Sequence, residues 1–191
     1  MKKTLLVLAL LFSVYFTASA QDADAILPRV SVGAGFGAAI GGFTSNYPVA
    51  MQLNAKFEYP VDDQLAIVAG TGISFFLAAS GYTYNSSTYG SSTTGDIATF
   101  VPVQVGARYY MSKLFVEGDA GASFNLGSTA GGPITKNAIV LTPSVGYGFR
   151  FGSSQRAGLD LSVGYDARLS TPAGGSSFNQ VFFKVAFSLG L

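Results

Sequence analysis

The sequence contains no histidine, no cysteine and no tryptophan, and only 11% of its residues are charged. Without histidine, the commonest general base and the commonest metal ligand of enzymes are both missing. Without cysteine, neither disulfide bonds nor thiol chemistry is available. We therefore expect no enzyme activity, no metal and no cofactor. An enzyme that relies on carboxylates alone is the remaining catalytic alternative.

An excess of charge of one sign is also missing. The chain has 11 basic and 10 acidic residues, and nine basic residues remain when Lys2 and Lys3 are subtracted (11 − 2). Nucleic-acid binding requires a basic face, so we expect no nucleic-acid partner. The hydrophobic fraction is 49%, which together with the scarcity of charge is unlike a small soluble domain, whose surface is about 25–35% charged.

The first twenty residues have the features of a signal peptide. Lys2 and Lys3 precede an apolar run at residues 5–16, and the small residues Ala18-Ser19-Ala20 follow. This order predicts export and cleavage between Ala20 and Gln21. The run is shorter than the ~20 residues of a membrane-spanning helix, although an N-terminal membrane anchor is the alternative. The predicted organisation is a signal peptide at 1–20, a short periplasmic segment at 21–28 and one β-barrel domain at 29–191.

After residue 20 no apolar run is long enough for a transmembrane helix, and apolar residues instead occupy every second position. This alternation marks eight segments, at about 30–40, 49–59, 65–77, 97–111, 114–124, 139–151, 159–169 and 181–191. Each segment has about the length that a tilted strand needs to cross a bilayer. The pattern predicts an all-β fold, an eight-stranded antiparallel up-and-down transmembrane β-barrel.

The connections between these segments alternate between short and long. Tight turns are expected at 60–63, 112–113 and 152–155, and polar loops at 80–96, 127–137 and 170–177. Short periplasmic turns and long outer loops are typical of outer-membrane barrels, and both termini then lie at the periplasmic end. Pro102 and Pro143 interrupt the fourth and sixth segments. They indicate bulges near the rim, or strands that begin later than the alternation suggests.

Charge decides which face of the barrel is inside. A soluble lipocalin-like ligand-binding barrel also alternates, but with its apolar residues inward. Here the apolar sets contain no charge, and the opposite faces carry five basic and five acidic residues: Lys56, Glu58, Arg108, Glu117, Asp119, Arg150, Asp160, Asp166, Arg168 and Lys184. Buried charges must be paired, and equal numbers permit this. We therefore predict an apolar face in lipid and a charged lumen.

Cross-strand neighbours predict particular partners within that lumen. Glu117 and Asp119 should lie near Arg108 and Arg150. Asp160 and Asp166 should lie near Arg150, Arg168 or Lys184. A structural network of this kind would plug the lumen, because eight strands leave little internal space. The alternative is a narrow pore for ions or small solutes.

With strands, turns and loops assigned, residues 28–191 resemble small OmpA/OmpX-type barrels. They resemble most the outer membrane protein beta-barrel domain family widespread in Bacteroidetes. The last segment, 181–191, resembles the strand that the barrel assembly machinery reads, although it ends in Leu191 and not in an aromatic residue. The resemblance implies the outer membrane of a Gram-negative bacterium, contact with outer-membrane lipid, and assembly by that machinery. We expect a monomer.

The long polar stretch at 80–96 is the predicted surface of contact. Tyr82, Tyr84 and Tyr89 lie there among Ser, Thr and Gly, a composition that binds other surfaces adaptably. An ordinary exposed loop has the same composition. We expect a non-enzymatic barrel with a structural or surface-interaction role through its extracellular loops.

Overall fold

The computed structural model describes residues 28–41, 44, 46–79, 83–85, 92–94, 97–128, 137–151, 156–170 and 179–191. The predicted signal peptide, its cleavage point between Ala20 and Gln21, and the turn at 152–155 lie outside the described residues. Within the described residues, no helix is both long and apolar enough to cross a membrane.

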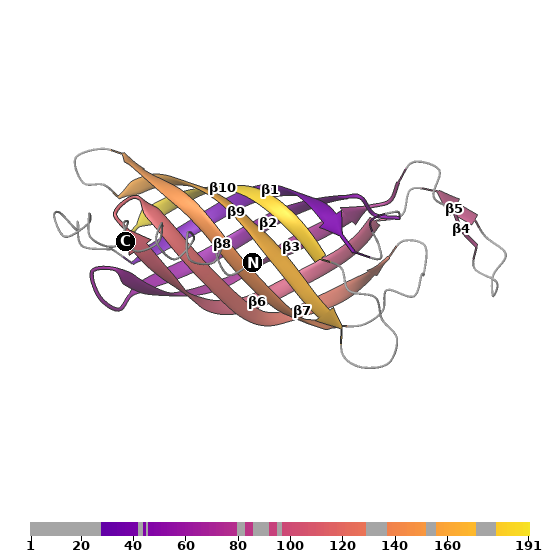
Figure 1. Ribbon diagram of the computed structural model, residues 1–191, viewed down its shortest axis with the longest axis horizontal. Coiled ribbons are helices and arrows are strands. Elements are labelled where there is room, and N and C mark those ends of the chain that lie inside the picture. Colours follow the sequence, from indigo (N-terminus) through magenta and orange to yellow (C-terminus); the bar gives the residue numbers. More distant parts are fainter. Residues whose placement is uncertain are drawn as a thin grey trace, which may run out of the picture.

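The main body is a closed barrel of eight antiparallel strands, which confirms the predicted fold class (Figure 1). The strands are β1 (Arg29–Ile40), β2 (Val49–Pro60), β3 (Leu65–Leu77), β6 (Ile97–Met111), β7 (Leu114–Ser128), β8 (Ala138–Phe151), β9 (Ala157–Ser170) and β10 (Asn179–Gly190). Each strand pairs with the next of these eight along the chain, so that β3 pairs with β6, and β1 pairs with β10 to close the barrel. Closure leaves no exposed sheet edge.

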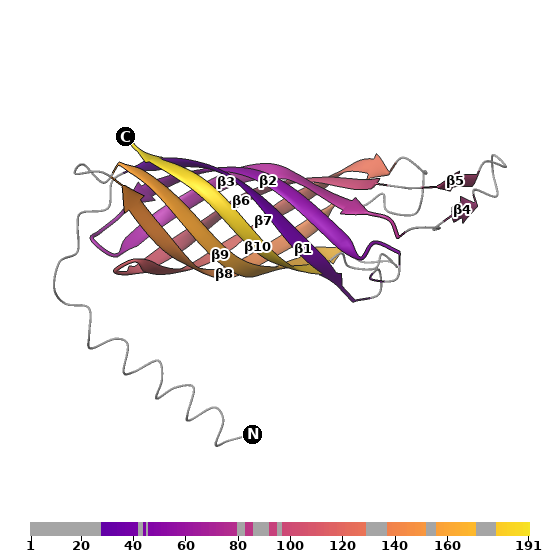
Figure 2. The ribbon, with the colours of Figure 1, turned by 90° about the horizontal axis from the view of Figure 1, so that it is seen from above.

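The two ends of the barrel differ in their connections. At one end, which we name the turn end, residues 61–64 join β2 to β3, and Ser112-Lys113 join β6 to β7. The Oδ1 atom of Asp62 accepts hydrogen bonds from the backbone N–H groups of Gln64 (2.8 Å) and Leu65 (2.7 Å). Ser112 has a φ of 63°, the left-handed conformation that such a tight turn uses. Figure 2 shows the C-terminus at this end.

The opposite end, the loop end, carries a short hairpin that the sequence did not predict. β4 (Thr83–Asn85) pairs with β5 (Ser92–Thr94) within the predicted polar loop 80–96, and the pair lies beyond the barrel (Figures 1 and 2). Threonine favours extended backbone, which suits this ribbon. Tyr82 and Tyr89 lie outside the described residues. β7 also continues to Ser128, two residues into the predicted loop 127–137, because it pairs there with β6.

The strands run through both prolines. β3 and β6 keep one register on either side of Pro102, with Thr71 opposite Val103 and Ser74 opposite Phe100. The β8–β9 ladder likewise keeps its register across Pro143. Proline forfeits one ladder hydrogen bond without displacing its strand. The alternative of late strand starts was therefore wrong. The other alternative, a bulge, has a counterpart in the described ladders only near Pro102, where the β6–β7 ladder shifts its register between Thr99 and Phe100.

The two faces of the barrel have opposite chemistry. Outward positions are apolar and exposed on every strand, with Val32 at 68% and Phe36 at 65% exposure. Inward positions carry the charges, small residues and a few aromatic rings, and Arg168 is only 1% exposed. The predicted orientation of the two faces is therefore confirmed. A soluble ligand-binding barrel would have its apolar residues inside, whereas here they lie outside.

Candidate functional site

All ten charged residues predicted for the lumen face inward. Strand parity explains this, because each of them alternates with the exposed apolar residues of its own strand. Eight are buried: Glu58, Arg108, Glu117, Asp119, Asp160, Asp166, Arg168 and Lys184. The other two, Lys56 and Arg150, are partly buried, with side chains 9% and 14% exposed.

Arg108 on β6 is the centre of an ion cluster in the turn-end half of the lumen. Its Nη1 atom lies 3.1 Å from Glu58 Oε2 and 2.9 Å from Asp160 Oδ2. Its Nη2 atom lies 2.5 Å from Glu117 Oε2, and its Cζ atom is 4.1 Å from the centroid of the Phe115 ring. One guanidinium thus contacts carboxylates from β2, β7 and β9. Charge-assisted bonds of this kind are the strongest hydrogen bonds in proteins.

Two further cations extend the cluster. Lys56 on β2 contacts Glu117 and lies 2.6 Å from Asp119 Oδ2. Arg150 on β8 lies 2.6 Å from Asp160 Oδ1. Glu117 therefore joins Arg108 to Lys56, and Asp160 joins Arg108 to Arg150.

This arrangement differs in part from the neighbour-based expectation. Glu117 lies beside Arg108 and Asp160 beside Arg150, but Asp119 contacts Lys56, which lies on a strand that is not a neighbour of β7. The narrow lumen allows long side chains to meet across it, which pairwise strand adjacency does not reveal. Lys184 forms no ion pair in the described part of the chain.

The loop-end half of the lumen is held differently. Asp166 on β9 accepts a hydrogen bond from Thr142 (2.7 Å) and one from Gln180 (2.5 Å). Thr142 in turn accepts one from Gln104 (2.7 Å). The nearest cation, Arg168, lies 3.4 Å from Asp166 through its Nη2 atom. Asp166 is thus bound mainly by neutral donors.

Arg168 lies against two aromatic rings. Its Cζ atom is 5.0 Å from the centroid of Phe76 and 5.5 Å from that of Phe100, and its Nη2 atom donates to Ser74 (3.1 Å). The rings of Phe76 and Phe100 meet edge to face, with centroids 5.7 Å apart. A cation held over ring faces in this way is stabilised by the ring quadrupoles.

Apolar clusters lie inside the barrel toward both of its ends. The loop-end cluster consists of Ala39, Tyr47, Ala50, Phe76, Ala98 and Phe100. The turn-end cluster consists of Ala66, Tyr110 and Phe115, and the Tyr110 hydroxyl donates to Glu58. Sequence reasoning missed these inward rings because it assigned apolar residues to the outer face. The aromatic doublets Phe75-Phe76 and Tyr109-Tyr110 were the available signal, since adjacent residues on a strand face opposite sides.

Sequence reasoning also missed an eleventh inward charge. Arg29, the first residue of β1, is 7% exposed and has the same parity as the inward-facing Ser31. With Arg29, the described inward faces carry six basic and five acidic residues instead of equal numbers. Among the described residues, no group of three or more acidic side chains is arranged to hold a metal ion.

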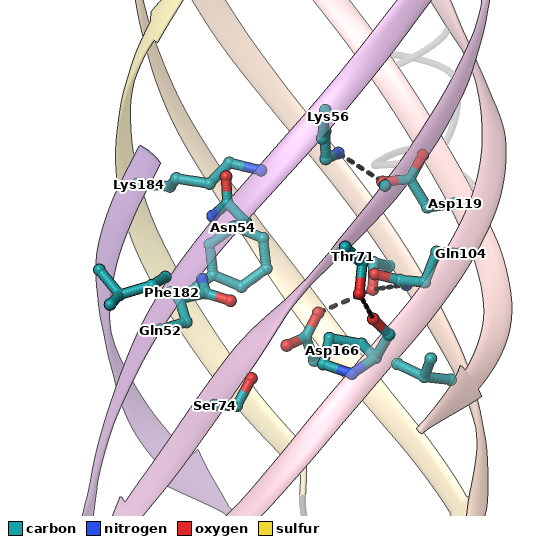
Figure 3. Close-up of a pocket in the computed structure, with 15 residues that line it drawn as sticks. Gln52, Asn54, Lys56, Thr71, Ser74, Gln104, Asp119, Asp166, Phe182 and Lys184 are labelled. Carbon is teal, nitrogen blue, oxygen red and sulfur yellow. Dashed lines mark hydrogen bonds and ion pairs between the residues drawn. The ribbon is translucent and has the colours of Figure 1, made fainter. Parts of the chain in front are cut away.

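A small cavity lies between the ion cluster and the loop-end residues (Figure 3). Its volume is about 30 Å³, and its lining includes Lys56, Asp119, Gln104, Asp166 and Lys184. A space of this size holds water molecules, whereas a ligand pocket of ordinary size is about 300–1,000 Å³. This cavity therefore has room for water molecules and not for a ligand of that size.

Fold and lumen together define the class: a small eight-stranded antiparallel barrel with the fold of outer-membrane barrels and a filled interior. The attachment invasion locus protein Ail of Yersinia pestis is similar, with a TM-score of 0.51 and 9% identity, over 87% of this chain and 100% of that one. The outer membrane enzyme PagL (TM-score 0.47, 10% identity, 84% and 99% covered) and the outer membrane protein AlkL (0.45, 16%, 87% and 89%) resemble it less. No family model and no curated protein matches the sequence.

Proposed function

We propose that this chain is a non-enzymatic integral outer-membrane barrel with a closed lumen, whose role is structural or is exerted through its extracellular loops. The observation that carries the proposal is the inversion of the barrel: its apolar side chains are outside and its charges are buried inside. Exposed large hydrophobic residues come from all eight barrel strands. Soluble monomers rarely expose so continuous an apolar surface, whereas lipid requires it.

The side chains that fill the lumen argue against the pore alternative. The Arg108 cluster contacts strands on several sides of the barrel, and apolar clusters lie at both ends. A conducting barrel needs a continuous aqueous path, and wide paths appear in barrels with many more strands. The loop end then remains as the part of the molecule that meets the surroundings, and the β4–β5 hairpin projects there (Figure 2).

The buried carboxylates also support a non-enzymatic role. Glu58, Glu117 and Asp160 contact Arg108, and Asp119 contacts Lys56. A general acid or base must reach a substrate proton directly or through one water molecule. The carboxylates of Glu58, Glu117 and Asp160, which are bound to Arg108 inside the barrel, do not meet this requirement.

Cysteine labelling tests the location and the orientation, because the chain has no cysteine of its own. Asn85→Cys lies on the β4–β5 hairpin, and Lys113→Cys lies in a tight turn at the opposite end. In intact cells a membrane-impermeant maleimide should label the first variant and not the second, and lysis should make both reactive. Equal labelling in intact cells, or release of the protein from membranes by carbonate, would contradict the proposal.

A loop-shortened variant separates the two roles. Residues 80–96 are replaced by a short Gly-Ser turn, and the variant is returned to cells that lack the protein. If the barrel itself supports the envelope, the variant restores the detergent resistance of these cells as well as the wild type does. If the hairpin binds other surfaces, the variant restores that resistance but does not restore the adherence of the cells. Failure of the wild-type gene to restore either property would refute both roles.

A further inference from the structure

Lys184, like Arg29, is a buried lumen cation that forms no ion pair among the described residues. It lies on β10 and is 7% exposed. Its Nζ atom is 5.5 Å from the centroid of the Phe182 ring. Lys56, by contrast, contacts both Glu117 and Asp119. A buried ammonium group is unfavourable unless polar atoms replace the water that it has lost.

Glycines of β1 bring polar side chains close to Lys184. In the strand register, Gly35 lies between Lys184 on β10 and Gln52 on β2. A Cβ atom on Gly35 would lie 3.0 Å from Gln52 Nε2, and one on Gly33 would lie 3.0 Å from Asn54 Oδ1. The side chains of Gln52 and Asn54 therefore lie over bare backbone. Figure 3 shows both of them on the same side of the cavity as Lys184.

Three buried polar atoms of the cavity lining have no hydrogen-bond partner among the described residues. They are Gln52 Nε2, Asn54 Oδ1 and Asp119 Oδ1. Asp119 as a whole is only 5% exposed. Buried polar atoms without partners are rare in folded proteins, and an ordered ligand or water usually accounts for them. All three residues line the cavity of about 30 Å³.

The mixture of donors and acceptors selects the ligand. An anion would suit Lys184 and Gln52 Nε2, but Asp119 and Asp166 of the same lining would repel it. A metal cation would suit the oxygen atoms, but the two lysines would repel it. Water both donates and accepts, and buried waters typically make about three hydrogen bonds.

We propose that the cavity is a binding site for a small cluster of water molecules that solvates the Lys184 ammonium group and connects it to Asn54 and Asp119. Water-mediated bonds of this kind are nearly as favourable as direct ones. The water then takes the place of a counter-ion for Lys184. The inference concerns the inside of the barrel and does not depend on the role of its loops.

Nuclear magnetic resonance of the lysine ammonium groups tests the site. The barrel is labelled with ¹⁵N at lysine side chains and inserted in lipid nanodiscs. After residue 20 the only lysines are Lys56, Lys113, Lys136 and Lys184, so that few signals arise, and Lys184→Met identifies the signal of interest. The expected result is a charged ammonium signal for Lys184 with a cross-peak to bound water. A neutral amine, or no water cross-peak, would overturn the proposal.

Variants of the lining give matched controls. Asn54→Leu removes an acceptor and fills space, so the water cross-peak of Lys184 should be lost. Ser188→Ala, at an inward position outside the cavity lining, should leave it unchanged. Asn54→Asp should replace the water by a direct ion pair and raise the urea midpoint of unfolding. A cross-peak that survives both Asn54 variants would contradict the water site. A Lys184 signal that shifts when bromide replaces chloride would show an anion site in its place.

Discussion

Two inward arginines, Arg108 and Arg168, are buried to a similar degree, at 5% and 1% exposure, yet their surroundings differ. Arg108, in the turn-end half, contacts three carboxylates from three strands. Arg168, in the loop-end half, lies 3.4 Å from Asp166. Both arginines lie over aromatic rings, Arg108 over Phe115 and Arg168 over Phe76. The turn-end half thus gathers three carboxylates around one guanidinium, whereas Asp166 in the loop-end half is bound mainly by neutral donors.

The two arginines also differ in the carboxylates that would lose a partner if the arginine were removed. Glu58, Glu117 and Asp160 face Arg108 within a closed lumen, so its loss would leave up to three carboxylates partly uncompensated. Asp166 would keep Thr142 and Gln180 as donors without Arg168. The cost of a buried charge depends more on its remaining partners than on its own burial.

The largest effect is expected for Arg108→Met. It should lower the free energy of unfolding by ~3–5 kcal/mol, because breaking a buried pair strands its partner charge. Urea unfolding in lipid vesicles measures the loss. The double variant with Glu117→Gln should cost less than the sum of the single changes, because the two side chains share one contact. Additive losses would show that the cluster is screened by water.

The next largest effect is expected for a charge on the outer face, because this face should lie in lipid. Val163→Arg, at an exposed position in the middle of β9, should cost ~2–4 kcal/mol, whereas Leu189→Arg near the turn end should cost ~0–1 kcal/mol. Both effects are measured by unfolding from vesicles. Equal costs at the two depths would contradict a lipid-facing surface. A control on the inward face should avoid Ser162, because an arginine there would lie directly opposite Lys184 in the strand register.

Arg168→Met sharpens the comparison of the two halves. We expect a loss of ~1–2 kcal/mol, because the ring contacts of the cation disappear while Asp166 keeps its neutral donors. The same vesicle assay applies, with Phe76→Leu as the companion change on the ring side. A loss as large as that of Arg108→Met would show that the two halves are equivalent.

The smallest effect is expected for Arg150→Ala. The Arg150 side chain is 14% exposed, and its partner Asp160 also contacts Arg108. The loss should therefore be ~0–1 kcal/mol, as for solvent-accessible pairs. If Arg150→Ala instead unfolds the barrel as readily as Arg108→Met, the charge of Asp160 depends on Arg150 and not on Arg108.

The sequence predicted the fold well because period-two alternation is a local signal. Strand parity placed Val32 and Phe36 outside and Lys56 and Glu117 inside. The alternative of late strand starts at the prolines failed because local propensity does not include the neighbouring strands, which pair with β6 on both sides of Pro102.

The contacts across the lumen could not be predicted in the same way. Parity states which side chains enter the lumen, but not which of them lie at the same height, since this depends on the stagger of the closed barrel. Lys56 and Asp119 are therefore together in the structure without any pattern that links them in the sequence. Arg29, in contrast, was within reach of the parity rule, because it directly precedes the outward-facing Val30.

Planar-bilayer conductance of the wild-type barrel tests the central claim most directly. If the Arg108 cluster and the two apolar clusters close the lumen, the barrel should insert without current steps at any applied voltage. Resistance of the barrel to protease confirms the insertion. Stable, reproducible steps of current from the inserted wild-type protein would contradict a closed lumen and favour a narrow pore.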